Sequence, residues 1–199
     1  MASKGYTLIE ILVAVGIFTV VIAAPTGFFV GSLKAQQKSL SSQALLDNVS
    51  YTLEYLSRAL RMAKKDTVGD CVLPAGAGNF MNYEKTVSRT LAGIVYSGPG
   101  IKFKNYQNPS VCQEIFLDES DKLLKESRNG GAPLPLTSKD LEVISFQIGS
   151  DDSWDQIDNE QPRITIFLEV KGIKSSMPEL QPQLQIQTTI SQRNLDVTY

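Results

Sequence analysis

The sequence predicts an α+β fold, in which one long N-terminal helix, with a transmembrane half and an amphipathic half, packs on an antiparallel β-sheet head. The first observation is an uncharged run from Ile11 to Val30, which is long enough to cross a bilayer as a helix. The second is the helical spacing of apolar residues in the segment that follows the run. The third is an alternation of apolar and polar residues toward the C-terminus, which is typical of half-buried antiparallel strands.

Composition narrows the function. The chain has 199 residues, a net charge of −2 and no histidine. The absence of histidine excludes Ser-His-Asp and Cys-His nucleophile systems and every histidine-dependent metal site. Acidic and basic residues are interspersed without a basic patch, so no nucleic-acid partner is predicted. We therefore expect neither an enzyme nor a cofactor, and one globular domain after the first 30 or so residues.

Two simple interpretations of the N-terminal run leave details unexplained. A signal peptide has a shorter apolar core and a small-residue cleavage site, and "FFVGSLKAQQ" offers only a poor one. A plain membrane anchor fits the length but gives no role to Glu10 or to the short polar leader "MASKG". Charge does not fix the orientation, because Lys4 flanks one end of the run while Lys34 and Lys38 flank the other.

The stretch "KGYTLIEILVAVGIF" favours a third interpretation. Gly5 ends a basic leader, the aromatic Tyr6 follows it, and Glu10 stands fifth when the count begins at Tyr6. This register resembles the class III leader of type IV pilins and type II secretion pseudopilins. The resemblance implies that a membrane prepilin peptidase cuts after Gly5 and that Tyr6, which stands where phenylalanine is usual, is then N-methylated.

Glu10 needs a partner, because an unpaired carboxylate in apolar surroundings is unfavourable. Cleavage creates a new ammonium group at Tyr6, and the resemblance implies that Glu10 pairs with this group on a neighbouring subunit and so sets the register of assembly. The pseudopilin at the extreme tip typically lacks this glutamate, so Glu10 implies a place beneath at least one other subunit. The alternative is a glutamate that extends to the membrane surface.

Pro25 lies inside the predicted helix and should kink it or melt it locally. Gly16, Gly27 and Gly31 add weak points and permit close approach of other helices. Similar pilins carry a helix break in this region that lets the stem extend during assembly. A simple proline kink is the equal alternative.

An amphipathic stem helix is predicted for residues 31–65. Residues 32–65 contain no proline or glycine, and their apolar residues recur at spacings of three and four. The predicted apolar stripe is Leu46, Val49, Leu53, Leu56, Leu60 and Ala63. It ends at "KKDTVGD", where charge and Gly69 interrupt the period.

The head, residues 66–199, reads as loops followed by strands. Residues 66–100 look irregular, with "LPAGAGN" and "SGPG" as loops. Short strands are expected at "IKFKNY" and in "QEIFLDESDKLLKES", which folds at "DESD". Three alternating strands follow, with apolar faces formed by Ile144, Phe146 and Ile148; by Ile164, Ile166, Leu168 and Val170; and by Leu184, Ile186, Thr188 and Ile190.

The order of elements adds a weaker resemblance. A long helix, a variable loop, a short hairpin and alternating strands that end in "ISQRN" are similar to the larger minor pseudopilins of the J type and the related W-type minor pilins. Those heads also end in a strand that runs into an "RN" tail, here Arg193 and Asn194.

Cys71 and Cys112 form no CxxC pair, and no other thiols complete a zinc site. They are two core thiols in a reducing compartment and a disulfide if the head is exported.

The acidic loop "SDDSWDQIDNE" contains Asp151, Asp152, Asp155, Asp158 and Glu160. These carboxylates are weak calcium candidates without EF-hand spacing, and a solvated turn is the favoured alternative.

The sequence thus predicts a leader at 1–5, a transmembrane and filament-core helix at 6–30, the stem at 31–65 and the head at 66–199. The implied function is that of a minor pilin or pseudopilin, which would act in filament initiation near the tip. Its expected partners are other pilins or pseudopilins, the prepilin peptidase/methyltransferase and the cytoplasmic membrane, with the head outside the cytoplasm. The alternatives are a single-pass anchor that carries an exported β-rich binding domain and, more distantly, an anchored hydrolase.

Overall fold

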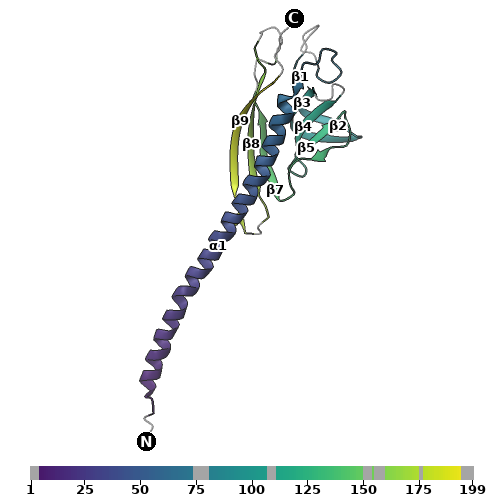
Figure 1. Ribbon diagram of the computed structural model, residues 1–199. Coiled ribbons are helices and arrows are strands. Elements are labelled where there is room, and N and C mark those ends of the chain that lie inside the picture. The colour runs from purple at the N-terminus through teal and green to yellow at the C-terminus, as the bar shows by residue number, and fades with distance from the viewer. Residues whose placement is uncertain are drawn as a thin grey trace. The chain divides into compact units, whose positions relative to one another are not determined.

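The computed structural model describes residues 5–73, 81–106, 111–149, 154, 160–174 and 177–193. The chain divides into two compact units, Met1–Leu40 and Ser41–Tyr199, and helix α1 (Leu8–Arg61) contributes to both. The predicted α+β class, with a long apolar N-terminal helix and an antiparallel β-sheet head, is confirmed (Figure 1).

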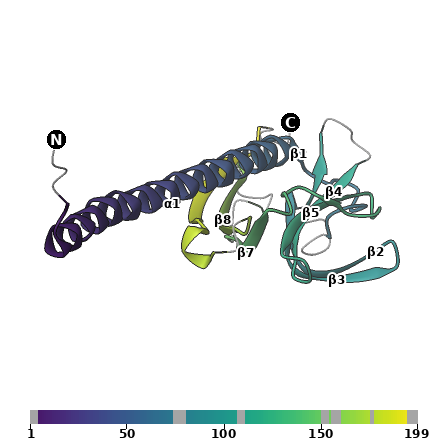
Figure 2. The ribbon, with the colours of Figure 1, turned by 90° about the horizontal axis from the view of Figure 1, so that it is seen from below.

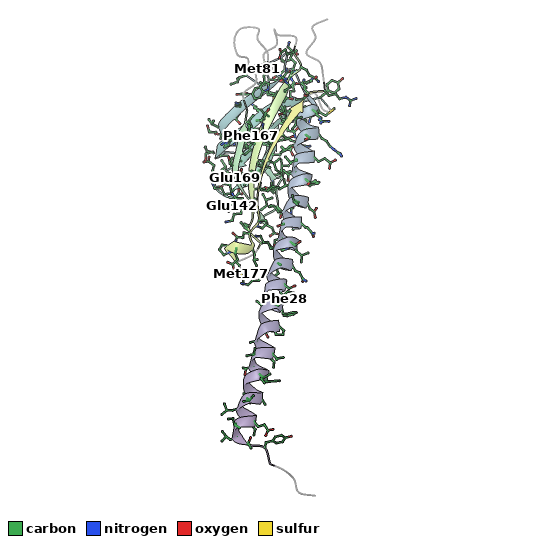
Figure 3. All side chains as sticks on the ribbon, turned by 90° about the vertical axis from the view of Figure 1, so that its left-hand side faces the viewer. Phe28, Met81, Glu142, Phe167, Glu169 and Met177 are labelled. Atoms are coloured by element: carbon green, nitrogen blue, oxygen red, sulfur yellow. A yellow bond between two sulfur atoms is a disulfide. The ribbon has the colours of Figure 1, made fainter. Side chains whose placement is uncertain are left out.

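The first unit consists of the apolar part of α1 and the residues before it. Helix α1 continues through Pro25, so the expected local melting is not seen at that position. None of the most apolar 18-residue window of α1 is buried within the chain, and its length and composition suit a membrane span. Phe28, for example, is 82% exposed, and its side chain points away from the helix in Figure 3.

In the second unit, the last five turns or so of α1 present one buried face. The buried positions are Leu45, Val49, Thr52, Leu56, Ala59 and Leu60. The predicted stripe is wrong at Leu46, which is 49% exposed, because the spacing of four before Val49 selects Leu45 instead. Thr52 fits this face because its hydroxyl donates to the carbonyl oxygen of Asn48, 2.9 Å away.

Helix α1 ends at Arg61, four residues before the expected end at Lys65, because the chain turns into strand β1 (Ala63–Lys64). Long-range backbone hydrogen bonds satisfy the carbonyl groups at this end. The amide of Arg193 donates to the Arg61 carbonyl at 2.9 Å, and the amide of Tyr106 donates to the Met62 carbonyl at 2.7 Å. The end of the helix is therefore fixed by segments far away in sequence.

The first sheet has six strands in the order β1-β3-β4-β5-β6, with β2 also paired to β3. Its other strands are β2 (Tyr83–Leu91), β3 (Ile94–Asn105), β4 (Cys112–Asp118), β5 (Leu123–Arg128) and β6 (Leu134–Pro135). All the pairings are antiparallel.

The expectation that residues 66–100 are irregular is wrong for 83–100. Strands β2 and β3 form a long hairpin, which Figure 2 shows as a curved pair. Ala92 and Gly93, with φ of 49° and 80°, make its tight turn, and "SGPG" lies within β3. Most of "LPAGAGN" lies outside the described residues. Alternation is weak in β2 because a register shift between Thr86 and Ser88 interrupts it.

The second sheet has the order β7-β8-β9, with strands β7 (Leu141–Ile148), β8 (Arg163–Gly172) and β9 (Gln183–Ser191). A short 3-10 helix, Pro178–Leu180, precedes β9. The predicted alternation is confirmed in β8 and β9, where one row of side chains faces the core. It is wrong for Ile144, which is 40% exposed, because a bulge between Val143 and Ser145 brings Val143 inward instead.

One hydrophobic cluster joins the second half of α1 to both sheets. Burial of each large apolar side chain in such a cluster contributes roughly 1.5–3 kcal/mol. Its members include Leu56 and Leu60 from α1; Tyr83, Phe103, Ile115 and Leu124 from the first sheet; and Val143, Phe146, Ile166, Leu168 and Ile190 from the second. The core therefore depends on the helix as much as on the strands.

Gly98 shows why a glycine lies within β3. Its φ of 129° is unfavourable for other residues, and a Cβ atom there would collide with the carbonyl oxygen of Leu117 and approach Glu119 Cγ to 3.2 Å. Gly93, in the hairpin turn, also has positive φ, but a Cβ atom there meets nothing within 4 Å.

We predict that Gly98→Ala lowers the free energy of unfolding by roughly 1–3 kcal/mol more than Gly93→Ala does, because only Gly98 adds a steric collision to the backbone strain. Thermal and urea unfolding of the full chain in detergent micelles, followed by circular dichroism, measures the difference. Equal losses for the two variants would show that the β3–β4 contact tolerates a side chain.

Candidate functional site

The residues that the sequence singled out for processing lie at an accessible end of the described chain. Gly5, Tyr6 and Thr7 precede the helix, and all three are exposed. A Cβ atom at Gly5 would meet nothing within 4 Å, so packing within the chain does not require glycine there. The Gly5–Tyr6 peptide bond is therefore accessible to a peptidase.

Glu10 lies in the first turn of α1, where the positive end of the helix dipole stabilises its carboxylate. One oxygen, Oε2, accepts from the backbone N–H and from the hydroxyl of Thr7, both at 3.4 Å. The Thr7-x-x-Glu10 spacing is that of a capping box, in which the two residues at a helix start satisfy each other. Sequence analysis missed this local role, although the T-x-x-E pattern carries the signal.

The contacts with Thr7 do not provide the cation that the Glu10 carboxylate needs in apolar surroundings. Both distances lie beyond the usual range of an N–H···O or O–H···O hydrogen bond, and both residues are exposed. The carboxylate therefore remains accessible to a cation from outside the chain. The arrangement is suited to a carboxylate that starts a helix and accepts a further partner.

The surface around Glu10 is almost wholly apolar. Large apolar side chains are exposed along the helix from Leu8 to Ile22 and again from Phe28 to Val30. At about 25 cal/mol per Å² of apolar area, so much exposed surface strongly favours transfer out of water. This segment must be covered by lipid or by other apolar helices.

Pro25 has no N–H to donate to the carbonyl of Val21, so it removes one helical hydrogen bond. Nearby, the hydroxyl of Thr26 donates to the carbonyl of Ile22 at 2.8 Å, and the hydroxyl of Thr19 donates to that of Val15. Hydroxyl groups bound in this way slightly weaken and bend helices. Residues 19–26 thus combine one missing backbone hydrogen bond with two hydroxyl contacts to helix carbonyls.

The structure joins Cys71 and Cys112 by a disulfide with a Cα–Cα distance of 5.3 Å. Cys112 begins strand β4, and Cys71 lies in the segment that follows β1. The bond closes a loop of 41 residues, and it is worth about 4 kcal/mol in the chain-entropy description.

The fully buried carboxylate of Asp66 organises the same segment. It accepts backbone N–H groups from Cys71 at 2.7 Å and Val72 at 2.9 Å, and the ammonium of Lys104 lies 3.1 Å away. Burial alone would raise the pKa of the Asp66 carboxyl, but these donors outweigh burial and hold its pKa well below the ordinary value. Sequence analysis missed this role, since Lys104 lies 38 residues away.

A polar cavity of about 530 Å³ lies beside the disulfide, on the face of the first sheet opposite α1. Its buried ion pair joins Arg89 Nε to Glu114 Oε1 at 2.8 Å, and the guanidinium lies over the ring of Phe116. Burial lowers the pKa of Arg89, while Glu114 opposes that shift. Arg89 thereby links β2 to β4.

The calcium candidates Asp151, Asp152, Asp155 and Asp158 lie outside the described residues, as does Asn194. Glu160 is described and exposed. Among the residues that the structure describes, no group of three or more metal-ligating side chains is present.

Comparison with known proteins agrees with this geometry. Residues 1–24 match the family described as "Prokaryotic N-terminal methylation motif". The match indicates a pilin- or pseudopilin-type subunit with a class III leader, which a prepilin peptidase processes and which assembles with other pilins. No curated protein and no solved structure matches the chain significantly.

We predict that Asp66→Asn lowers the free energy of unfolding at pH 7 by about 2–3 kcal/mol, because an amide cannot satisfy two backbone donors and a buried ammonium together. Asp70→Asn is the control. Asp70 binds the same ammonium but its side chain is 55% exposed, so the expected loss is below about 1 kcal/mol.

The stability difference between wild type and Asp66→Asn should also depend on pH. The Asp66 pKa is depressed in the folded protein, so its stabilising contribution is complete above the unfolded value of about 3.9 and decreases as the pH falls toward the folded value. The difference in stability between wild type and Asp66→Asn should therefore shrink below about pH 4. Thermal unfolding of full-length protein in detergent from pH 7 to pH 2 measures it. A constant difference would contradict a charged Asp66.

Proposed function

We propose that this protein is a minor pilin or pseudopilin, which acts in the initiation and assembly of a type IV pilus or a type II secretion pseudopilus near its tip. The observation that carries the proposal is the match of residues 1–24 to the methylation motif, in register with an apolar helix that its own chain leaves uncovered. The subunit enters the cytoplasmic membrane with its head outside the cytoplasm and then moves into the filament.

The exposed apolar helix supports a two-stage role. In the membrane, lipid covers residues 6–30, and in a filament the same surface packs against the helices of other subunits. Both environments are apolar, so the transfer between them does not expose the segment to water. We propose that the stem adjusts its length near Pro25 during this transfer, because the proline removes one helical hydrogen bond and the Thr26 hydroxyl shares the carbonyl of Ile22.

Glu10 gives the assembly its register in this proposal. Cleavage after Gly5 creates an ammonium group at Tyr6, and a carboxylate in the apolar filament core is tolerable when such a cation reaches it. The carboxylate is exposed, and its contacts with described residues are the two long ones to Thr7, so it can accept the ammonium of a neighbouring subunit. Its presence supports a position beneath at least one other subunit.

The finer proposal is a subunit of the J type or the related W type. The order of elements in the head, from a long helix to a closing strand that leads into Arg193, supports it. The proposed division is a leader at 1–5, a membrane and filament helix at 6–30, a stem at 31–65 and a head at 66–199.

We predict that mature protein from cells with an active prepilin peptidase begins at Tyr6 and carries one added methyl group. Intact-mass analysis of the full-length product measures both changes. Gly5→Val should remain uncut, because the side chain blocks the cleaved bond. Gly16→Ala, where a Cβ atom meets nothing within 4 Å, should be processed normally. An N-terminus that remains at Met1 or Ala2 would favour the alternative of an anchored, exported binding domain.

A second prediction separates the two roles of Glu10. Glu10→Gln keeps the size and helix propensity but removes the charge, so we expect normal insertion and cleavage with poor incorporation beside partner subunits. Thr7→Ala removes the hydroxyl partner of Glu10 and keeps the carboxylate, so we expect near-normal incorporation.

Cross-linking of cysteines placed in adjacent stems measures incorporation for both variants. If Thr7→Ala fails as severely as Glu10→Gln, then the carboxylate acts through the start of the helix and not through a neighbour. If Glu10→Gln assembles as well as wild type, the carboxylate does not set the register.

A further inference from the structure

Two connections join the segment that follows β1 to the middle of the first sheet. The first is the disulfide between Cys71 and Cys112, whose Cα atoms are 5.3 Å apart. The second is non-covalent and runs from the Asp66 carboxylate to Lys104 on β3, the strand beside β4. Asp66 belongs to the same segment as Cys71, so the two connections hold the same parts of the head together.

The Asp66 carboxylate holds the backbone of Cys71 through bonds that do not involve the sulfur atom. Its Oδ2 atom accepts the N–H groups of Cys71 at 2.7 Å and Val72 at 2.9 Å. Its Oδ1 atom accepts those of Val68 at 3.3 Å and Gly69 at 3.1 Å. The side chain is fully buried, and hydrogen bonds to a charged group are about twice as strong as neutral ones. Residues 66–72 are therefore wrapped around a single carboxylate.

Lys104 carries the non-covalent connection to the position of Cys112. Its ammonium lies 3.1 Å from Asp66 Oδ1 and also binds Asp70. Within the sheet, Lys104 pairs with Lys64 of β1 on one side and with Cys112 of β4 on the other. The side chain of Lys104 thus ties the Asp66 segment to the point on β3 that lies directly opposite Cys112.

These contacts form a closed ring of four residues, in which the disulfide is one link. The N–H bond of Cys71 leads to Asp66, and the ion pair leads from there to Lys104. The strand pairing of Lys104 with Cys112 completes the ring. A fully buried carboxylate that loses its partners is unfavourable, so the links through Asp66 are favoured whether or not the sulfur atoms are bonded.

We propose that Asp66 and Lys104 are positioning residues for the oxidation of Cys71 and Cys112. They order the reduced segment, so the two thiols meet without a further loss of backbone freedom, which otherwise opposes such a closure. This inference rests on the contacts of the first sheet and does not depend on the proposed role in a filament.

The oxidation itself is an exchange with a disulfide reagent, for which glutathione disulfide is the probe. The thiolate of one cysteine attacks the reagent, forms a mixed disulfide and releases one glutathione. The thiolate of the other cysteine then attacks the mixed disulfide and releases the second glutathione. The two cysteines lose two electrons and two protons, and the reagent becomes two thiols.

Equilibration with glutathione measures how Asp66 affects this bond. Full-length protein in detergent micelles is held in buffers of reduced and oxidised glutathione, and thiol alkylation followed by mass analysis gives the dithiol and disulfide fractions. We expect the equilibrium constant for oxidation to be lower on the order of tenfold in Asp66→Asn, and to fall in Lys104→Gln too, because residues of one network are coupled. A role in stability alone would weaken both redox forms equally and leave the constant unchanged.

Asp70→Asn is the matched control. It removes the other carboxylate that binds Lys104, but this side chain is 55% exposed, and the Cys71 N–H donates to Asp66. We expect its equilibrium constant to change less than about threefold. Equal constants for wild type and Asp66→Asn, or equal losses in Asp66→Asn and Asp70→Asn, would overturn the proposal.

Hydrogen exchange gives a second readout that needs no sulfur chemistry. Cys71→Ala with Cys112→Ala removes the disulfide, and we expect residues 66–72 of the full-length protein to remain protected, because the Asp66 carboxylate still accepts their N–H groups. Adding Asp66→Asn should raise exchange in this segment on the order of tenfold relative to β8, whose strand pairing is untouched. Mass analysis of peptic peptides reports both regions. A segment that is already unprotected once the cysteines are replaced would show that the disulfide itself orders it, and that result would also overturn the proposal.

Discussion

The constraint on which this protein depends is an apolar helix that its own chain leaves uncovered. From Leu8 to Val30 the large apolar side chains are exposed, and none of the most apolar window is buried. Such a surface is stable only in lipid or against other apolar helices. The proposed passage from membrane to filament follows from this requirement, because both surroundings are apolar.

The second half of the same helix belongs to the hydrophobic core of the head. From Leu45 to Leu60 one face is buried against two antiparallel sheets, and the end at Arg61 is fixed by the amide of Arg193. The hydrophobic core of the head therefore includes side chains of α1 as well as of both sheets. A single helix thus contributes to the core with its second half, while its first half exposes its large apolar side chains.

The first sheet of the head is held by a disulfide and by buried charges. The disulfide, the buried Asp66 carboxylate and the Arg89–Glu114 pair fix the segments around the first sheet. Removal of one partner from such a pair is unfavourable, because a buried charge then loses its compensation. Strand β9 of the second sheet carries none of these devices, and no other described strand pairs with its second edge.

Sequence alone determined the features that depend on local spacing. The leader register of Gly5, Tyr6 and Glu10, the apolar run and the alternation in β8 and β9 follow from neighbours in the chain. Tertiary structure decided the features that depend on distant partners. The carbonyl oxygen of Leu117 comes so close to Gly98 in β3 that no side chain fits at this position. The bulge in β7 turns Ile144 outward. The physical reason is that periodicity records which face is apolar, whereas bulges, buried ion pairs and helix ends are set by contacts between distant segments.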